Sequence, residues 1–103
     1  MKIYFIYVTF GYFKEDKRLW GQLVKKKLAA CVNIIKISSI YTWVGKTENK
    51  DEYLALFKTT KKNQLALKKE LEKLHPYDVA EIAEINVESI NQPYMKWLVD
   101  STN

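Results

Sequence analysis

Strand-type and helix-type patterns alternate along this chain in an order that leaves few possible folds. β-Branched and aromatic residues fill positions 2–10, and apolar residues at three- and four-residue spacing follow between about 14 and 28. Two long strand-type segments, 30–44 and 47–60, then flank Gly45, the natural turn of a hairpin. A second helical pattern reaches Leu74, a fourth strand-type segment covers 79–87, and a short helical pattern ends the chain.

The order β-α-β-β-α-β plus a terminal helix predicts an α+β fold of the ferredoxin-like type, a split β-α-β arrangement with an antiparallel sheet. Right-handed crossovers then place both long helices on one side of that sheet. An interruption at 36–39 predicts a bulge or bend in the long strand. Helix caps are expected at Thr59 or Thr60 and at Asn91 or Gln92, with Pro76 ending the second helix. The apolar faces of the last two helices are expected to comprise Leu67, Leu71 and Leu74, and Tyr94, Trp97 and Leu98.

The apolar content predicts that this domain does not remain alone. Its 103 residues fit one domain spanning 1–103, yet 48% are hydrophobic, including three Trp, seven Tyr and four Phe. Helices on one side leave the other sheet face bare. Strand alternation also places Tyr41 and Trp43 on one face of the hairpin and Ile40 on the other. Because both faces need cover, we expect identical chains to associate.

Composition argues against several partners and compartments. No apolar run approaches the ~18 residues of a membrane span, so we expect no membrane partner. A single cysteine, Cys31, excludes an internal disulfide framework and favours a reducing compartment, the cytoplasm. The net charge is +5, but Arg18 is the only arginine among 17 basic residues, and the lysine runs fall inside helical patterns. They favour a solvated face over a phosphate-binding stripe, which makes a nucleic-acid partner an unfavoured hypothesis.

Few residues are candidates for chemistry. His75 is the only histidine and precedes Pro76, Tyr77 and Asp78. It is a candidate ligand for copper or another divalent metal ion, but its residue type and its place at a helix end favour contacts with the last helical carbonyls. Cys31 lies in a buried-strand pattern that favours core packing. Without a Ser/His/Asp set, suitably paired carboxylates or a cofactor fingerprint, we expect no enzyme and no assured cofactor.

Four sequence blocks carry a resemblance to a known family. They are Ala-Ala-Cys-Val-Asn-Ile at 29–34, Ser-Ile-Tyr-Thr-Trp-Val-Gly-Lys at 39–46, Lys-Thr-Thr at 58–60 and His-Pro-Tyr-Asp at 75–78. In this order they resemble the CutA family of divalent-cation tolerance proteins. The resemblance implies a homotrimer of ferredoxin-like subunits whose sheets surround a threefold axis and whose long hairpins reach a neighbour. It also implies a link between His75 and copper, and an inter-subunit cleft lined by Trp43, Lys58, Tyr77 and Glu81.

Three functions follow as hypotheses. The first is a CutA-like trimer involved in tolerance of divalent metal ions, with weak copper binding or a small ligand at the clefts. The second is a signalling trimer similar to the PII proteins, which bind small effectors between subunits. The third is an RNA-binding sheet, although the expected Gly-aromatic signature is missing. For the cleft residues, a Lys-to-Glu pair that only holds subunits together is an equal alternative to a ligand site.

Overall fold

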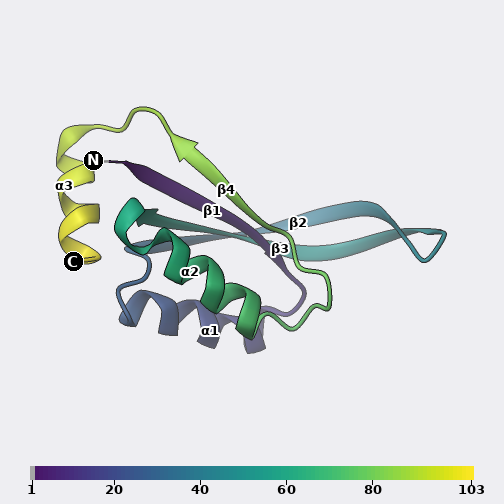
Figure 1. Cartoon of the computed structure of the whole chain (residues 1–103). Coiled ribbons are helices and arrows are strands. Elements are labelled where there is room, and N and C mark those ends of the chain that lie inside the picture. The colour runs from purple at the N-terminus through teal and green to yellow at the C-terminus, as the bar shows by residue number, and fades with distance from the viewer. Residues whose placement is uncertain (1) are drawn as a thin grey trace.

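The computed structural model describes residues 2–103, which form one four-stranded sheet with helices on one face and at one end (Figure 1). The elements run in the predicted order: β1 (Ile3–Phe10), α1 (Phe13–Lys25), β2 (Cys31–Trp43), β3 (Lys46–Thr60), α2 (Lys61–Leu74), β4 (Ile82–Val87) and α3 (Gln92–Ser101). The strand order in the sheet is β2-β3-β1-β4, and all neighbours are antiparallel. The ferredoxin-like prediction is therefore confirmed.

Strand alternation assigns alternate residues to the two faces of the sheet. On β1, Tyr4, Ile6, Val8 and Phe10 are buried, and they pack with side chains of α1 and α2 in the main core. Trp20 and Leu23 come from α1, and Leu67 and Leu71 from α2. This core fixes both helices on one face, here called the helical face.

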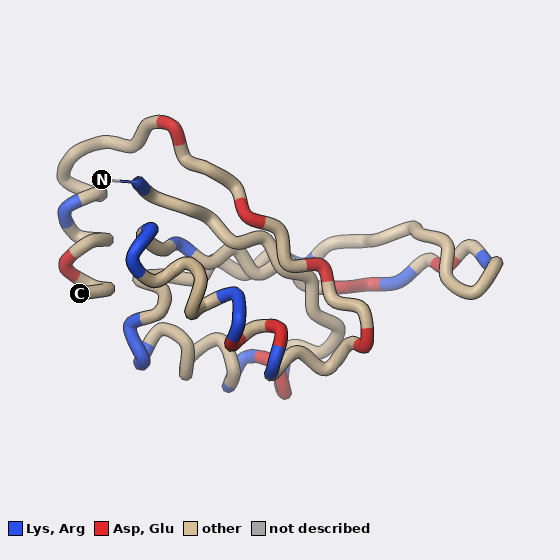
Figure 2. Tube along the Cα trace, viewed as in Figure 1, with Lys and Arg blue, Asp and Glu red and all other residues tan. Residues whose placement is uncertain are grey.

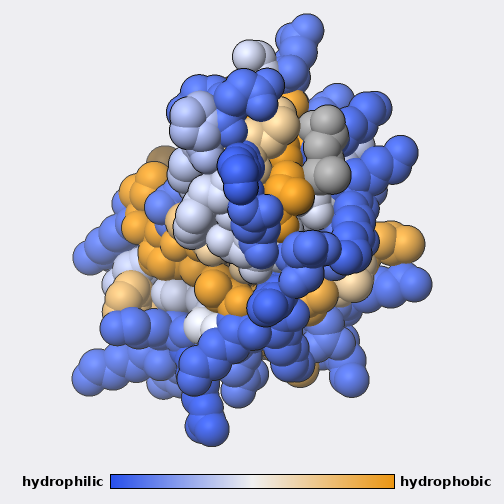
Figure 3. Space-filling model, turned by 90° about the vertical axis from the view of Figure 1, so that its left-hand side faces the viewer, coloured by the Kyte–Doolittle hydropathy of each residue, from blue (hydrophilic) through white to orange (hydrophobic). Residues whose placement is uncertain are grey.

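The opposite face, here called the open face, is covered only at one end. There α3 contributes Leu98, which packs with Ile3 and Ala30, and partly buried neighbours such as Phe5 and Tyr94. Elsewhere apolar side chains such as Ile35 and Ile85 remain 55% and 44% exposed. Apolar surface also shows as orange patches when the molecule is viewed from the α3 end (Figure 3).

A hairpin extends beyond the body of the sheet. β1 pairs with β3 as far as Phe10 opposite Tyr53, whereas β2 and β3 continue to pair as far as Trp43 opposite Lys46. Residues 37–52 therefore have no third strand beside them and project from the body in Figure 1. Val44 and Gly45 make the turn with φ of 50° and 74°, the left-handed geometry of a tight two-residue hairpin.

Several local predictions are wrong. The predicted bulge at 36–39 is absent, since β2 and β3 pair without a break there. β4 begins at Ile82 rather than at 79, because 75–81 crosses the end of the sheet as a loop. Leu74 and Trp97, expected on buried faces, are 40% and 46% exposed in the single chain.

The helix caps are partly as predicted. Thr60 and Asn91 occupy the N-cap positions of α2 and α3, but neither side chain makes a capping hydrogen bond. Thr59 instead donates its hydroxyl to the carbonyl of Leu28, 2.7 Å away, and so ties β3 to the segment before β2.

The helices carry charged residues of both signs. Basic and acidic positions are interspersed along the helices (Figure 2). None of the helices among residues 2–103 combines the length and apolar character that a membrane crossing requires.

Candidate functional site

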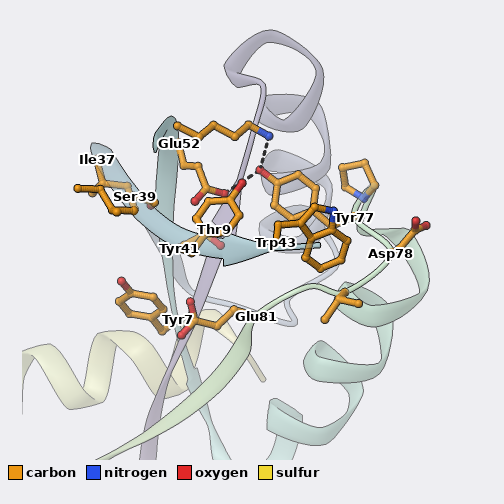
Figure 4. Close-up of a pocket in the computed structure, with 14 residues that line it drawn as sticks. Tyr7, Thr9, Ile37, Ser39, Tyr41, Trp43, Glu52, Tyr77, Asp78 and Glu81 are labelled. Carbon is orange, nitrogen blue, oxygen red and sulfur yellow. Dashed lines mark hydrogen bonds between the residues drawn. The ribbon is translucent and has the colours of Figure 1, made fainter. Parts of the chain in front are cut away.

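A groove of about 720 Å³ lies on the open face, at the root of the projecting hairpin. Its walls come from alternate residues of β1, β2 and β3 and from the loop that follows α2 (Figure 4). This volume is typical of sites for small ligands. The lining includes four aromatic residues, Tyr7, Tyr41, Trp43 and Tyr77, and three acidic residues, Glu52, Asp78 and Glu81.

The local sequence explains why these side chains converge. Ile37, Ser39, Tyr41 and Trp43 are alternate residues of β2, so all four lie on the same side of the hairpin. Pro76 follows His75 at the end of α2, where it forces the chain out of helical geometry. The loop can then pass over the open end of the groove and bring Tyr77 and Glu81 to it.

A hydrogen-bonded group of three side chains forms one end of the groove. The hydroxyl of Tyr77 donates to Oε2 of Glu52 at 2.7 Å, and Nζ of Lys50 donates to the same hydroxyl at 3.3 Å (Figure 4). Lys50 also lies over the rings of Tyr77 and Tyr12, with Nζ 4.9 and 5.9 Å from their centroids. Glu52 is only 6% exposed. The loop residue Tyr77 is thus fixed to the hairpin through a buried carboxylate.

Burial and the neighbouring carboxylate change the acidity of Tyr77. Desolvation of the phenolate, followed by the hydrogen bond to Glu52, raises the pKa of Tyr77 well above its ordinary value of 10.0. The hydroxyl therefore keeps its proton at physiological pH and serves as a donor, not as a base.

His75 supports this loop with both ring nitrogens. Nε2 lies 2.7 Å from the carbonyl oxygen of Thr9, and Nδ1 accepts the backbone N–H of Tyr77 at 3.0 Å. A carbonyl only accepts, so Nε2 carries the proton and the neutral ring fulfils both roles. The ring also stacks on Phe10, with centroids 4.3 Å apart. Burial lowers the pKa of His75 below 6.5, although the Thr9 carbonyl and the Asp16 and Glu52 charges oppose the shift.

These contacts bear on the metal hypothesis. Residues 2–103 place no three His, Cys, Asp or Glu side chains where they could jointly hold a metal ion. A metal ion at His75 would in addition have to displace one of its two hydrogen bonds. The residues of one chain therefore do not fit a copper site.

The structure brings together three of the four predicted cleft residues. Trp43, Tyr77 and Glu81 all line the groove. Lys58 lies elsewhere on the open face: its Nζ is 3.4 Å from the Tyr94 hydroxyl and 5.6 Å from the centroid of the Phe5 ring. No ion pair joins Lys58 to Glu81 within the described chain.

Sequence reasoning missed Glu52 and Lys50, which form one end of the groove together with Tyr77. They fall in the charged run Lys50-Asp51-Glu52, which is typical of a solvated hairpin end. One signal was available, because both residues keep the even-numbered alternation of Lys58 and so share its face.

Comparison with known proteins gives one consistent family. The sequence model described as "CutA1 divalent ion tolerance protein" matches residues 4–101. The divalent-cation tolerance protein CutA of Pyrococcus horikoshii is 36% identical over 97 residues, covering 94% of this chain and 95% of that protein. A CutA homologue of Xenopus laevis is 46% identical over 95 residues, covering 91% of this chain and 63% of that protein.

Solved structures agree with the sequence comparison. CutA1 of Pyrococcus horikoshii superposes with a TM-score of 0.92 at 34% identity, covering 97% of this chain and 98% of that one. CutA of Synechococcus elongatus superposes with a TM-score of 0.95 at 30% identity, covering 99% and 91% of the two chains. The similarity therefore extends over the sheet, the helices and the projecting hairpin.

Proposed function

We propose that this chain, which belongs to the CutA1 family of divalent ion tolerance proteins, acts in the response to divalent cations as a homotrimer. Relatives such as the Pyrococcus horikoshii protein carry divalent-cation tolerance in their names. That name supports the proposed biological role, and the uncovered apolar surface of the open face supports the proposed assembly.

The observation that carries the proposal is the uncovered apolar surface of the sheet. Beyond the reach of α3, the open face presents Ile35 and Ile85 to solvent, with Leu54 and Leu56 only partly covered. Contiguous apolar surface of this kind marks an interaction site in a soluble protein. Within residues 2–103 the helices already cover the helical face and the α3 end, so none of the described elements lies over this surface.

In the proposed assembly the groove becomes a cleft between subunits. The projecting hairpin carries Trp43, which is 49% exposed, so a neighbour that packs on the hairpin also packs along the groove. Lys58 would then join Trp43, Tyr77 and Glu81 only through contact between chains, because its own chain holds it beside Tyr94.

The mass of the native particle tests the assembly. Native mass spectrometry and sedimentation should show a species of three chains, each of 12.2 kDa. A well-folded single chain at working concentration would remove the assembly and, with it, the inter-subunit cleft.

Calorimetric titration tests the copper part of the proposal. Cu(II) is titrated into the wild type and into His75→Ala, with Leu65→Ala on the exposed side of α2 as the control. Weak binding by the wild type that is lost in His75→Ala alone would support a role for the imidazole. Equal heats from all three proteins would remove His75 as a ligand, as the two hydrogen bonds of its ring suggest.

The PII-like alternative is not favoured. The relatives and structures named above are CutA proteins, and the chain has only three glycines, with no glycine-rich phosphate loop. The cytoplasm stays a prediction based on Cys31, since relatives include proteins named chloroplastic in rice and periplasmic in Archaeoglobus fulgidus.

A further inference from the structure

We propose that the groove at the root of the hairpin binds a small organic ammonium ion, a protonated amine attached to an aromatic or other apolar body. This inference rests on the groove described above and names the class of ligand that its chemistry fits. Three properties carry it: a buried carboxylate with a free oxygen, an excess of acidic over basic lining residues, and aromatic walls.

The first property is the state of Glu52. This side chain is 94% buried, and Oε2 accepts the hydroxyl of Tyr77. No residue within 2–103 donates a hydrogen bond to its second oxygen, and no ion pair joins it to a basic residue of that range. That oxygen is not among the fully buried unpaired atoms of residues 2–103, so it opens to the groove, where it can accept from a ligand that brings a positive charge and an N–H donor.

The second property is the balance of charge around the groove. Asp78 and Glu81 add to Glu52, while Lys50 is the only basic residue in the lining. Lys50 directs its ammonium group to the Tyr77 hydroxyl and to the faces of two tyrosines. A Lys58 added by a neighbouring subunit in the proposed trimer would still leave acidic residues in excess, so the groove keeps a net negative charge. This charge disfavours phosphates, nucleotides and carboxylates and favours cations.

The third property distinguishes an organic cation from a metal ion. The rings of Tyr7, Tyr41, Trp43 and Tyr77 supply apolar faces around the carboxylates. Aromatic faces attract ammonium groups and bury the carbon skeleton that carries them, but they provide no ligand for a divalent metal. Residues 2–103 also lack any three-ligand cluster. One carboxylate with aromatic walls is sufficient for an amine and insufficient for a metal ion.

Lys50 shows how an ammonium group is held at this groove. Lys50 places Nζ 3.3 Å from the Tyr77 hydroxyl and within 5.9 Å of the centroids of two tyrosine rings, so one protein ammonium already uses this mode of contact beside Glu52. A ligand ammonium at the free oxygen of Glu52 would repeat it on the groove side. The volume of about 720 Å³ exceeds what one amine of this kind needs, which leaves room for a larger skeleton.

The test uses phenethylamine as the probe and 2-phenylethanol as its uncharged counterpart of similar shape. Each is titrated into the purified protein by calorimetry at pH 7, with two-dimensional NMR to locate the site. The expected result is binding of phenethylamine with shifts at Trp43 and Tyr77, and binding of the alcohol that is at least about tenfold weaker, as expected for loss of a charged hydrogen bond.

Two variants with the same change of charge separate the site from the surface. Glu52→Gln keeps an acceptor for Tyr77 and removes the buried charge, whereas Asp51→Asn removes a charge from the exposed, opposite side of the same strand. We expect Glu52→Gln to weaken phenethylamine binding about tenfold or more and Asp51→Asn to leave it unchanged. Thermal melts show whether both variants are folded. If Glu52→Gln does not fold, Trp43→Leu provides a second variant of the groove lining, outside the body of the sheet.

Each outcome decides the inference. No binding of phenethylamine, equal binding of the alcohol, or equal weakening by both charge variants would overturn it, as would NMR shifts confined to other surfaces. Because all the lining residues belong to one chain, the titration can succeed even if native mass shows a monomer. Failure of the ammonium site and failure of the trimer are therefore separate results.

Discussion

At the scale of single residues, His75 holds the loop after α2 in place through two hydrogen bonds of its ring. Its neutral ring accepts from the Tyr77 backbone through Nδ1 and donates to Thr9 through Nε2. Protonation of Nδ1 would remove the acceptor and turn two N–H groups toward each other. The loop that carries Tyr77 into the groove therefore depends on the uncharged imidazole.

The pH dependence of stability follows from the lowered pKa of His75. A group whose pKa is lower in the folded state than in the unfolded state binds more protons when unfolded, so stability rises with pH in that window. The contribution is complete above about 6.5, the unfolded value, and is lost as pH falls through the lower, folded value. Asp16 and Glu52 oppose the shift and limit its size.

Urea unfolding between pH 8 and pH 5 measures this effect. His75 is the only histidine, so the difference between the wild type and His75→Gln isolates it. We expect that difference to favour the wild type most at pH 8 and to shrink toward pH 5. A difference that grows as pH falls would mean that the folded protein stabilises the imidazolium.

Gly11 tests the contact between the first loop and the groove. A Cβ added at Gly11 would lie 2.8 Å from the Tyr77 hydroxyl and 3.4 Å from Nζ of Lys50. Tyr77 cannot retreat without leaving Glu52, so we expect Gly11→Ala to lower the free energy of unfolding by about 1–3 kcal/mol, as overpacking does. Chemical denaturation measures the change, and the Tyr77 hydroxyl should lose its hydrogen bond to Glu52 by NMR.

Gly21 is the matched control for Gly11. It lies in α1, and a Cβ there would meet nothing within 4 Å. Gly21→Ala should therefore raise the free energy of unfolding by about 0.5–1 kcal/mol, because alanine is the better helix former. Equal effects of the two substitutions would show that the contact with Tyr77 does not restrict position 11.

At the scale of elements, the hairpin turn carries local strain. Val44 adopts a φ of 50°, which is rare for a β-branched residue, beside Gly45 at 74°. Asn-Gly is the favoured pair for this turn, and Val44 is 84% exposed. We expect Val44→Asn to stabilise the protein by about 1 kcal/mol through relief of strain, measured by urea unfolding. A loss of stability would indicate that a neighbouring subunit covers the Val44 side chain.

The helices and strands were predictable because their sequence patterns are local. The errors occur where the structure depends on contacts between distant parts of the sequence or on exposure to solvent. The two-residue period of β1 and the three- and four-residue spacing around Trp20 and Leu23 need only nearby sequence. The absent bulge at 36–39 was inferred from polar residues, but a strand that projects into solvent tolerates polar side chains without a break in pairing. β4 starts later than predicted because contacts with residues far away in sequence hold the loop before it. Tyr77 bonds to Glu52, and His75 bonds to Thr9.

The candidate site was predictable only where local sequence identifies its residues. Trp43, Tyr77 and Glu81 were found through sequence blocks, and all three line the groove. Glu52 and Lys50 were not, since nothing local distinguishes a buried carboxylate from a solvated one in a charged run. Glu52 becomes buried only when the loop after α2 passes over the hairpin. This contact joins Glu52 to Tyr77, which lies 25 residues further along the chain.

At the scale of the whole molecule, the open face determines whether the protein remains a single chain. Ile35 is 55% exposed on β2 and lies on the same side as the partly buried Ile37. Its side chain makes little contact within its own chain, so a charge there costs the monomer little. In an assembly that buries this face, an unpaired charge would be strongly unfavourable.

Ile35→Lys therefore separates folding from association. We expect the variant to keep its far-ultraviolet circular dichroism while its native mass falls toward that of one 12.2 kDa chain. Leu65→Lys is the matched control, because Leu65 is 56% exposed but lies on α2, on the helical side. That control should leave the assembly intact. If Ile35→Lys associates as the wild type does, subunits do not meet through the β2 side of the open face.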